Sequence, residues 1–213
     1  MNYAEHEELI HHFLKDLNRE TSAFVLKGGT ALRQCYGLDR ISEDIDLDCT
    51  ARNMIPFAQK FCKINSLACR VAKDTDTVKR VFITYGNHDE HRLKVEVSYR
   101  QKTIPEDGVI NINGITVYSI DQIAAMKAAA YLGRDKIRDL YDIIFICNTY
   151  FDELSSATKT LLMNGFWYKG LEAFDYLIQT EQDPLINKEK LADDFLKIWD
   201  KLGLMKEKAD VGE

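Results

Sequence analysis

The chain contains little that would cross-link it or place it in a membrane. Its five cysteines are odd in number and form no CxxC pair, which argues against a disulfide scaffold and favours a reducing cytoplasm. No apolar run reaches the roughly 18 residues that a membrane-spanning helix needs. The segment 1–18 also lacks the cationic start and apolar centre of a signal peptide. We therefore expect a cytoplasmic protein that does not bind a membrane.

Positive charge is also scarce, since the formal net charge at pH 7 is −6. This argues against a protein coated with positive charge for general nucleic-acid binding, although a local basic site remains compatible with it. The five histidines, at positions 6, 11, 12, 88 and 91, show no HExxH or other metal-ligand spacing. Cys62 and Cys69 have no histidine partners at zinc-finger spacing. We expect no zinc site and treat the histidines as surface or packing residues.

The residues that are present divide the chain into two parts. Helical spacing predicts helices over 5–18, 30–37 and 55–64, and apolar runs or alternation predict strands over 23–27, 44–49, 67–72, 77–85 and 92–99. The segment "VININGITVY" predicts a hairpin with Asn113-Gly114 at its turn. From residue 119 onward the patterns are helical, over 119–132, 135–149, 154–163, 168–180 and 187–202. This predicts an α+β fold with an α/β domain over 1–118 and a helical bundle over 119–213.

The helical half is rich in aromatic side chains. We expect them to form its core rather than to stack on bases. They are Phe166, Trp167, Tyr168, Phe174, Tyr176 and Trp199.

An acidic strand is the first chemical feature. In "EDIDLDC", Asp44, Asp46 and Asp48 alternate with apolar residues and therefore point to one face. Carboxylates at neighbouring same-face positions can converge on a pair of divalent ions. The alternative is a half-exposed edge strand whose aspartates are solvated.

Two glycines precede this strand, in "VLKGGTAL". A turn of this kind between a strand and a helix can aim backbone N–H groups and the positive helix end at an anion, and Thr30 can cap the helix or bond a phosphate. The alternative is a plain connecting turn. Thirteen residues separate Thr30 from Asp44, enough for one short helix and a return loop. The pairing of a phosphate cradle with metal carboxylates is more specific than either part.

Two later segments add charged candidates. In "RLKVEVSYR", Glu96 shares a face with Lys94 and could join the aspartates from a neighbouring strand, or it could simply face solvent. Lys127 is the only charge between Asp121 and Arg134 and is surrounded by alanines. It could reach a triphosphate or snorkel at a helix rim, and its replacement by alanine is expected to leave folding nearly unaffected. "RDKIRDLYD" could meet phosphates or form a helix laced with local ion pairs.

Together these segments resemble the AbiEii/AbiGii-type nucleotidyltransferase-like toxins of the polymerase-β-like nucleotidyltransferase superfamily. The segments that carry the resemblance are "LKGGTAL", "RISEDIDLD", "LKVEVS" and "KAAAYLGRDKIRDLYDI", between Leu26 and Ile143. The resemblance implies a nucleotidyltransferase-type mixed β-sheet with flanking helices, followed by an all-α helical bundle. Glu96 departs from it, because the third acid of the family is usually aspartate.

The resemblance also implies roles for individual residues. Those expected to bind the nucleotide are Lys27, Gly28, Gly29, Thr30, Arg138 and Asp142. Those expected to act in catalysis are Asp44, Asp46, Glu96, Lys127 and Asp139. Asp44, Asp46 and Glu96 are also the expected ligands of two Mg²⁺ ions, for which Mn²⁺ could substitute. Asp48 lies outside the family pair and is interpreted as a bystander or supporting group.

The function implied is Mg²⁺-dependent transfer of a nucleoside monophosphate from an NTP to an acceptor hydroxyl. The expected acceptor is RNA, such as a tRNA 3′ end, and the expected context is a toxin–antitoxin or phage-defence pair with a cognate antitoxin protein. Two alternatives stay open. One is a nucleotidyltransferase that modifies a protein hydroxyl on a partner, which the acidic balance favours. The other is a catalytically silent partner-binding protein of the same fold, which the Glu96 departure favours.

Overall fold

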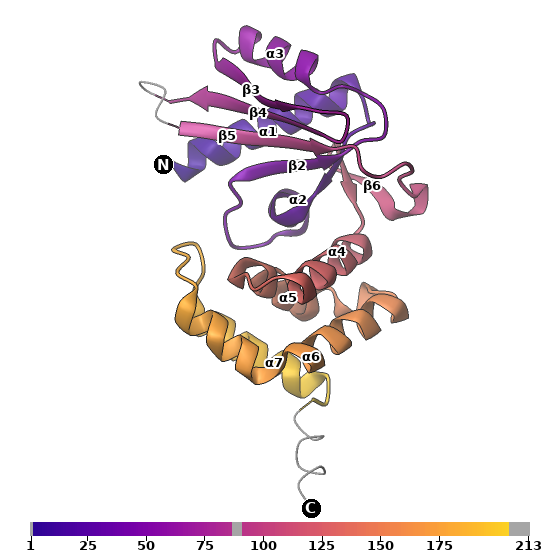
Figure 1. Ribbon diagram of the computed structural model, residues 1–213, viewed down its shortest axis with the longest axis vertical. Helices are drawn as coiled ribbons and strands as arrows, with labels where there is room; N and C mark the ends of the chain where they lie inside the picture. Colours follow the sequence, from indigo (N-terminus) through magenta and orange to yellow (C-terminus); the bar gives the residue numbers. More distant parts are fainter. Residues whose placement is uncertain (1, 87–90, 205–213) are drawn as a thin grey trace, which may run out of the picture. The chain divides into compact units, whose positions relative to one another are not determined.

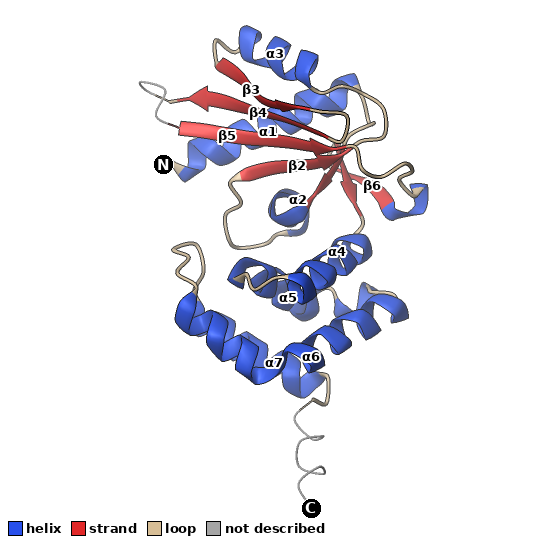
Figure 2. Cartoon of the chain, viewed as in Figure 1, coloured by secondary structure: helices blue, strands red, loops and turns tan. Residues whose placement is uncertain are grey.

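The computed structural model describes residues 2–86 and 91–204. Residue 88, one of the histidines considered above, lies outside the described residues. The chain divides into two compact units, Met1–Ser119 and Ile120–Glu213. The sequence patterns predicted the domain boundary between residues 118 and 119. We refer to these parts as the α/β unit and the helical unit (Figures 1 and 2).

The α/β unit consists of one mixed sheet with helices around it. Its elements are α1 (Tyr3–Glu20), β1 (Val25–Lys27), α2 (Gly28–Tyr36), β2 (Asp44–Asp48), α3 (Ile55–Ile64), β3 (Ala68–Asp74), β4 (Val78–Tyr85), β5 (His91–Ser98), the short η2 (Glu106–Gly108), β6 (Val109–Ile112) and β7 (Ile115–Tyr118). Every helix and strand predicted for this part is present, with boundaries that differ by a few residues at most. Helix α3, with Pro56 in its first turn, has the predicted bounds.

The strand order of the seven-stranded sheet is β3-β4-β5-β2-β1-β7-β6. β2 runs parallel to β5 and antiparallel to β1, and β1 runs parallel to β7. The acidic strand β2 is therefore an inner strand, with a neighbour on each side. The interpretation of this segment as a solvated edge strand is wrong.

Alternation along the strands separates the core from the open face. Ile45 and Leu47 of β2, like the apolar side chains of β5, are almost completely buried. Helices α1 and α3 pack together over this core, and the Phe13 and Phe61 rings meet edge-to-face with centroids 5.1 Å apart. The polar side chains of β2, β4 and β5 point to the other face and are mostly half-buried.

Backbone conformation explains two turns. Asn113 and Gly114 both have positive φ, 49° and 79°, as the two-residue turn of a type I′ hairpin requires. The hairpin predicted from this dipeptide is therefore confirmed. Gly37 ends α2 in the left-handed conformation, with φ 77°.

The helical unit contains α4 (Ile120–Gly133), α5 (Ile137–Thr149), the short η3 (Phe151–Glu153), α6 (Ser156–Thr180) and α7 (Lys188–Lys201). The two helices predicted over 154–163 and 168–180 form one run, α6, which is interrupted at Gly170 instead (φ 66°, ψ −177°). Residues 164–167, where a break was predicted, have helical backbone angles. Glycine can adopt a positive φ at little cost, so the break falls on Gly170.

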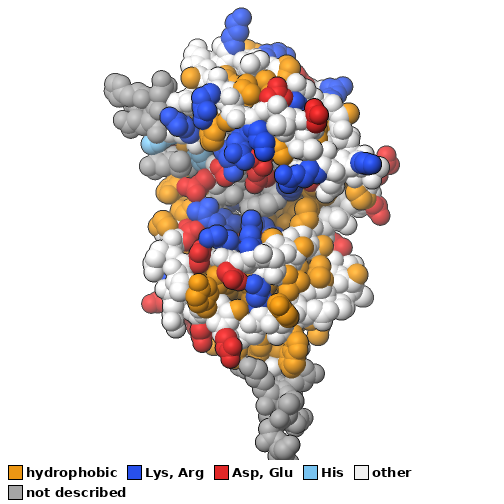
Figure 3. Space-filling view, in the orientation of Figure 1, with side chains coloured by type: hydrophobic (Ala, Val, Ile, Leu, Met, Phe, Trp, Pro, Cys, Tyr) orange, Lys and Arg blue, Asp and Glu red, His pale blue; other side chains and the backbone are white. Residues whose placement is uncertain are grey.

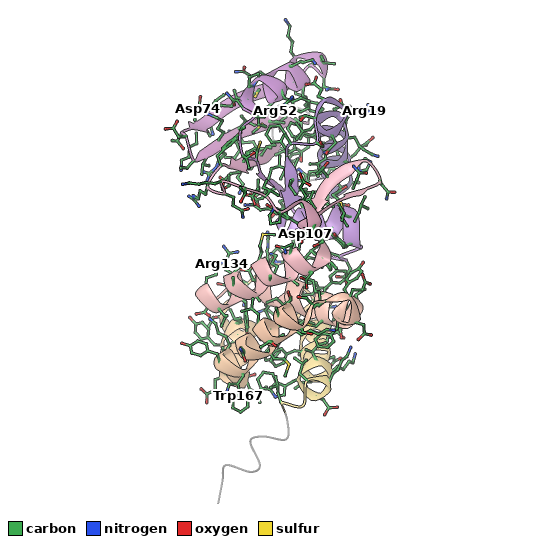
Figure 4. All side chains as sticks on the ribbon, turned by 90° about the vertical axis from the view of Figure 1, so that its right-hand side faces the viewer. Arg19, Arg52, Asp74, Asp107, Arg134 and Trp167 are labelled. Atoms are coloured by element: carbon green, nitrogen blue, oxygen red, sulfur yellow. The ribbon has the colours of Figure 1, made fainter. Side chains whose placement is uncertain are left out.

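The aromatic side chains of this unit are divided between its core and its surface. Phe166 and Trp199 are buried, whereas Tyr168 is 78% and Trp167 is 50% exposed. Figure 4 labels Trp167 on the helical unit. Phe174 is buried and Tyr176 is exposed. The expectation that all six form the core is thus wrong for three of them. Neighbouring residues on a helix point about 100° apart, so a run such as 166–168 cannot face one core.

Among the described helices, none is both long and apolar enough to cross a bilayer.

Candidate active site

The carboxylates of β2 lie at the centre of the sheet, on its open face. Asp44 and Asp46 are partly exposed, and the Asp44 side chain retains 43% of its accessible surface. Asp48 is only 1% exposed. The three aspartates therefore share a face, as alternation predicts, but not an environment.

Glu96 joins Asp46 from the neighbouring strand. The two residues are direct partners in the parallel pairing of β2 and β5, so their side chains point to the same face. The structure therefore brings together the three acids that sequence analysis grouped. A row of charged residues crosses four strands here, in the order Lys27, Asp46, Glu96 and Arg80, so that the two neighbouring acids are flanked by one cation on each side.

Two of the three acids hold a basic side chain. Lys94 Nζ lies 2.6 Å from Asp44 Oδ2, and Arg80 Nη2 lies 2.5 Å from Glu96 Oε2. Burial lowers the pKa of the Lys94 ammonium, but its hydrogen bond to Asp44 and the surrounding carboxylate charge outweigh that effect, so the pKa is raised. These pairs reduce the repulsion among the acids.

Asp46 is the exception. Its carboxylate makes no hydrogen bond or ion pair with any residue that the structure describes. Burial is the largest cause that raises its pKa, and the charge of Lys94 only partly opposes it. The charges of Asp44 and Glu96 raise the pKa further. Asp46 is thus a half-buried acid between two other acids, without a cation of its own.

Asp48 belongs to a closed arrangement. Its Oδ1 lies 2.5 Å from Lys27 Nζ, and its Oδ2 accepts a hydrogen bond from the Tyr118 hydroxyl at 3.1 Å. Lys27, which the family resemblance assigns to nucleotide binding, is therefore held by Asp48 in this structure. Asp48 is therefore held by two residues of the chain, and its expected role as a bystander or supporting group stays a prediction.

The Gly-Gly turn lies directly beside Asp46. Gly28 has φ +76°, and a Cβ added to it would lie 3.7 Å from Asp46 Oδ2. Helix α2 starts here without a side-chain cap and without an acid in its first turn. Its first N–H groups and its positive end are thus available to an anion next to the acids.

The position of Arg40 explains why residue 29 is a glycine. A Cβ on Gly29 would lie 2.7 Å from Arg40 Nη2 and 3.0 Å from Ser42 Oγ. Arg40 is only 5% exposed, and its Nη1 donates to the Ile41 carbonyl at 3.0 Å. A buried guanidinium therefore rests against the backbone of the turn. The hydroxyl of the adjacent, buried Thr30 bonds to the Asp44 carbonyl and to Ser42, so it braces the entry to β2.

The helical unit holds a separate charge cluster. Lys127 Nζ lies 2.7 Å from Asp142 Oδ2 and 3.1 Å from Asp139 Oδ1, and Arg134 Nε lies 2.6 Å from Asp139 Oδ2. Burial alone would raise the pKa of Asp139, but the Arg134 hydrogen bond and the charge of Lys127 lower it. The structure thus groups Lys127 with Asp139 and Asp142, whereas Arg138 pairs with Asp183. The pairs of Lys127 and Arg138 join separate segments, unlike the local pairs considered from the sequence, whereas Arg134 pairs with Asp139 within the same segment.

The donor set of the α/β unit is suited to a hard divalent cation. Carboxylate oxygens are the side-chain ligands that Mg²⁺ prefers. As the side chains stand, no three acidic, histidine or cysteine groups among the described residues converge tightly enough to hold a metal ion. Asp44 and Glu96 would have to release Lys94 and Arg80 first, whereas Asp46 has no partner to release among the described residues.

Comparison with known proteins adds the family. A family model described as "Nucleotidyl transferase AbiEii toxin, Type IV TA system" matches residues 12–205. The chain belongs to the AbiEii family of nucleotidyl transferase toxins. No sequence among the curated proteins matches the chain. The resemblance stated from the sequence motifs is confirmed.

Solved structures similar to this AbiEii-family chain extend over both units. A putative nucleotidyltransferase from Helicobacter pylori has 29% identity and a TM-score of 0.78, covering 98% of each chain. JHP933 from Helicobacter pylori has 28% identity and a TM-score of 0.77, covering 99% of this chain and 97% of its own. The MenT4 nucleotidyltransferase toxin from Mycobacterium tuberculosis has 18% identity and a TM-score of 0.53, covering 86% of this chain and 69% of its own, and shares the fold. The predicted fold class is confirmed.

Sequence analysis of this AbiEii chain missed the basic residues around the acids. Arg40 could have been found as a lone arginine between the short helix and the acidic strand, in "DRISEDID". Arg80 and Lys94 gave a weaker signal, because alternation along β4 and β5 shows their face but not the strand beside them. His6 was expected to be a surface or packing residue. It is fully buried, and its Nε2 lies 2.8 Å from the Glu43 carbonyl just before β2.

Proposed function

We propose that this protein transfers a nucleoside monophosphate from an NTP to an acceptor hydroxyl at Asp44, Asp46 and Glu96. The observation that carries the proposal is Asp46, a partly buried carboxylate without a described partner, between two further acids and beside a glycine turn at an open helix N-terminus. Repulsion among such acids is unfavourable in the protein alone. A cation and a phosphate would together compensate both the acids and the helix end.

Asp44 and Asp46, with Glu96, would hold Mg²⁺; the proposal includes two ions, for which Mn²⁺ could substitute. When bound, such ions lower the pKa of an attacking hydroxyl and stabilise the charge on the pyrophosphate that leaves. Binding is tested without catalysis by thermal denaturation. Mg²⁺ at 100 times its Kd should stabilise the parent by about 2.7 kcal/mol and should leave an Asp44→Asn/Asp46→Asn double variant unchanged. Equal stabilisation of both proteins would remove the metal from the proposal.

The turn and α2 would bind the triphosphate. Backbone N–H groups after Gly28 can donate to phosphate oxygens, and the absence of a side chain at Gly28 lets a phosphate approach the backbone. The buried Arg40 places a fixed positive charge against Gly29. Lys27 lies opposite Asp46 across the strand pair and would add a second cation.

In the reaction, the acceptor oxygen forms a bond to the α-phosphorus while the bond to the bridging oxygen of pyrophosphate breaks. Residues of this chain would position the donor and the acceptor so that these two oxygens lie in line. Lys127 and Asp139 are further proposed catalytic residues, and Arg138 and Asp142 further nucleotide-binding residues. The support for them is the family resemblance and the cation that Asp139 and Asp142 hold.

The proposed biological role is that of a toxin whose acceptor is RNA and whose effect is countered by a cognate antitoxin protein, in a toxin–antitoxin or phage-defence pair. The family membership supports the toxin role. Transfer to a protein hydroxyl is the second candidate, favoured by the net charge of −6, because a phosphate-rich acceptor generally prefers a basic surface.

One experiment separates these functions. The protein is incubated with each labelled NTP and Mg²⁺, together with either total RNA or total protein, and in parallel with an Asp46→Asn variant. Label in RNA with the parent only supports the proposal, and label in protein supports the second candidate. If neither pool is labelled with any NTP, the protein has the fold without the activity and the proposal fails.

A further inference from the structure

The open face of the sheet carries positive charge beyond the acids. Two rows of directly paired residues run from β2 across β5 and β4 to the edge strand β3. One row is Asp44, Lys94, Phe82 and Arg70. The other is Asp46, Glu96, Arg80 and Lys73. Both rows change from acidic at β2 to basic at β3. We call Arg70, Lys73, Arg80, Phe82 and Lys94 the basic strip.

An irregularity in β3 aims both of its cations at this face. Arg70 and Lys73 are three residues apart, so in a regular strand their side chains would point to opposite faces. The pairing of β3 with β4 shifts register between Val71 and Lys73, so that Arg70 opposes Phe82 and Lys73 opposes Arg80. Bulges of this kind redirect a side chain. Here the bulge adds one cation to the open face.

These two cations are available to a ligand. Arg70 and Lys73 are exposed, and neither has a carboxylate partner among the described residues. Figure 3 shows Lys and Arg side chains gathered with Asp and Glu side chains on the visible face of the α/β unit. In a chain of net charge −6, such a local excess of positive charge points to an anionic partner.

An aromatic ring lies within the strip. The Arg70 guanidinium carbon lies 4.9 Å from the centroid of the partly exposed Phe82 ring. Single-stranded nucleic acids bind to surfaces that combine cations for the phosphates with aromatic rings and arginine planes for the bases. A bare triphosphate would need no ring, and its proposed cradle lies on the β1 side of the acids, away from the strip.

We infer that the basic strip binds single-stranded RNA and leads its acceptor end to Asp46. This inference rests on the proposed function, since it identifies the surface that would hold the acceptor of that reaction. Three strand steps separate β3 from β2, or about 14 Å at the usual strand spacing. The phosphates would follow Arg70 and Lys73 at the sheet edge, and a base would stack on Phe82.

The test measures RNA binding by fluorescence anisotropy with a short labelled single strand, without NTP or divalent metal, over salt from about 50 to 200 mM. An Arg70→Ala/Lys73→Ala double variant should bind about tenfold more weakly. The slope of log affinity against log salt should become shallower by about 1.4, since each phosphate contact on a single strand contributes about 0.7. Phe82→Ala should bind at least about fivefold more weakly with an unchanged slope, because no charge is lost.

The matched control is Lys60→Ala/Lys63→Ala on α3, which removes the same charge from a helix that packs with α1 over the buried face. It should bind RNA like the parent. Parent-like binding by the Arg70/Lys73 variant, an equal loss in the control, or tighter binding of DNA of the same sequence would overturn the inference. Because binding is measured without the reaction, RNA binding at the strip without transfer would count against the proposed function alone. Transfer to RNA that the strip variants perform like the parent would count against the strip alone.

Discussion

The protein contains two clusters in which lysine meets carboxylates, and they differ in charge balance and in access to water. In the helical unit, Asp139 and Asp142 have side chains that are 2% and 0% exposed, and Lys127 and Arg134 hold them. On the sheet, Asp44, Asp46 and Glu96 are partly exposed, and within the described part of the chain only two of the three pair with a cation. The first cluster is balanced by the protein's own residues, so its stability needs no ligand. The second keeps an unbalanced acid, which points to a partner outside the chain.

The largest expected effect comes from removing the lysine of the closed cluster. Lys127→Ala should lower the free energy of unfolding by roughly 3 kcal/mol, because it leaves two buried carboxylates with too little compensation. The expectation from the alanine-rich sequence, that folding would be nearly unaffected, does not fit the ion pairs to Asp139 and Asp142. Urea denaturation measures the loss.

Lys94→Ala is the matched control in the open cluster. The Lys94 and Asp44 side chains are 27% and 43% exposed, so solvent replaces much of their interaction. The cost should be below about 1 kcal/mol. Equal losses in the free energy of unfolding for Lys94→Ala and Lys127→Ala would show that the two clusters do not differ in how strongly burial couples the lysine to its carboxylates.

The next effect concerns the unbalanced acid itself. Asp46→Asn should reduce nucleotidyl transfer by at least about 10²-fold, because the central carboxylate of the proposed metal site is lost. Asp48→Asn should keep most of the transfer per folded molecule and instead lower the melting temperature, since it breaks the buried pair with Lys27. Labelled-NTP assays and thermal denaturation separate the two outcomes. If both variants are equally inactive, the ligands have been assigned one strand step away from their true positions.

A smaller effect, on stability and NTP binding, tests the role of the glycine turn. Gly28→Ala forces a side chain into φ +76° and should cost about 1–2 kcal/mol of stability. Gly37→Ala should cost a similar amount, because its φ is +77° and no atom crowds it. Only the change at Gly28 should also weaken NTP binding, since its Cβ would lie near Asp46. Equilibrium dialysis with labelled NTP checks this, and a parallel loss at Gly37 would mean that folding alone explains it.

The smallest effect is a difference in pH dependence between the clusters. The pKa of Asp46 is raised in the folded state, so the folded protein binds the proton more tightly than the unfolded chain does. Stability due to this group is therefore present at acid pH and is lost as the pH rises through the raised pKa. The pKa of Asp139 is lowered, so its contribution is present above the unfolded value and is lost as the pH falls.

Without divalent ions, Asp46→Asn should therefore be slightly more stable than the parent at neutral pH, by less than about 1 kcal/mol, and the difference should disappear in acid. Melting curves over the acid-to-neutral range measure it. An advantage that grows as the pH falls would show that Asp46 is stabilised as a carboxylate.

Much of the fold was predictable because its signals are local. The Asn113-Gly114 turn, the Pro56 helix start and the alternation of β2 each depend on neighbouring residues, and each prediction is confirmed. The break in α6 was misplaced because the Asn164-Gly165 dipeptide is typical of a turn, whereas within α6 only Gly170 adopts a non-helical backbone.

By itself, the sequence determined which side chains share a face and which segments carry the family motifs. Alternation and helical period depend only on backbone geometry, and the order of the motifs can be read along the chain. Tertiary structure alone decided which of these charged side chains are paired with an opposite charge or a hydrogen-bond partner. Tyr118 and Lys27 close around Asp48, Arg40 packs against Gly29, and Asp46 is left without a described partner. Strand order joins residues far apart in sequence, and the cost of an unpaired charge depends on burial that local patterns do not contain.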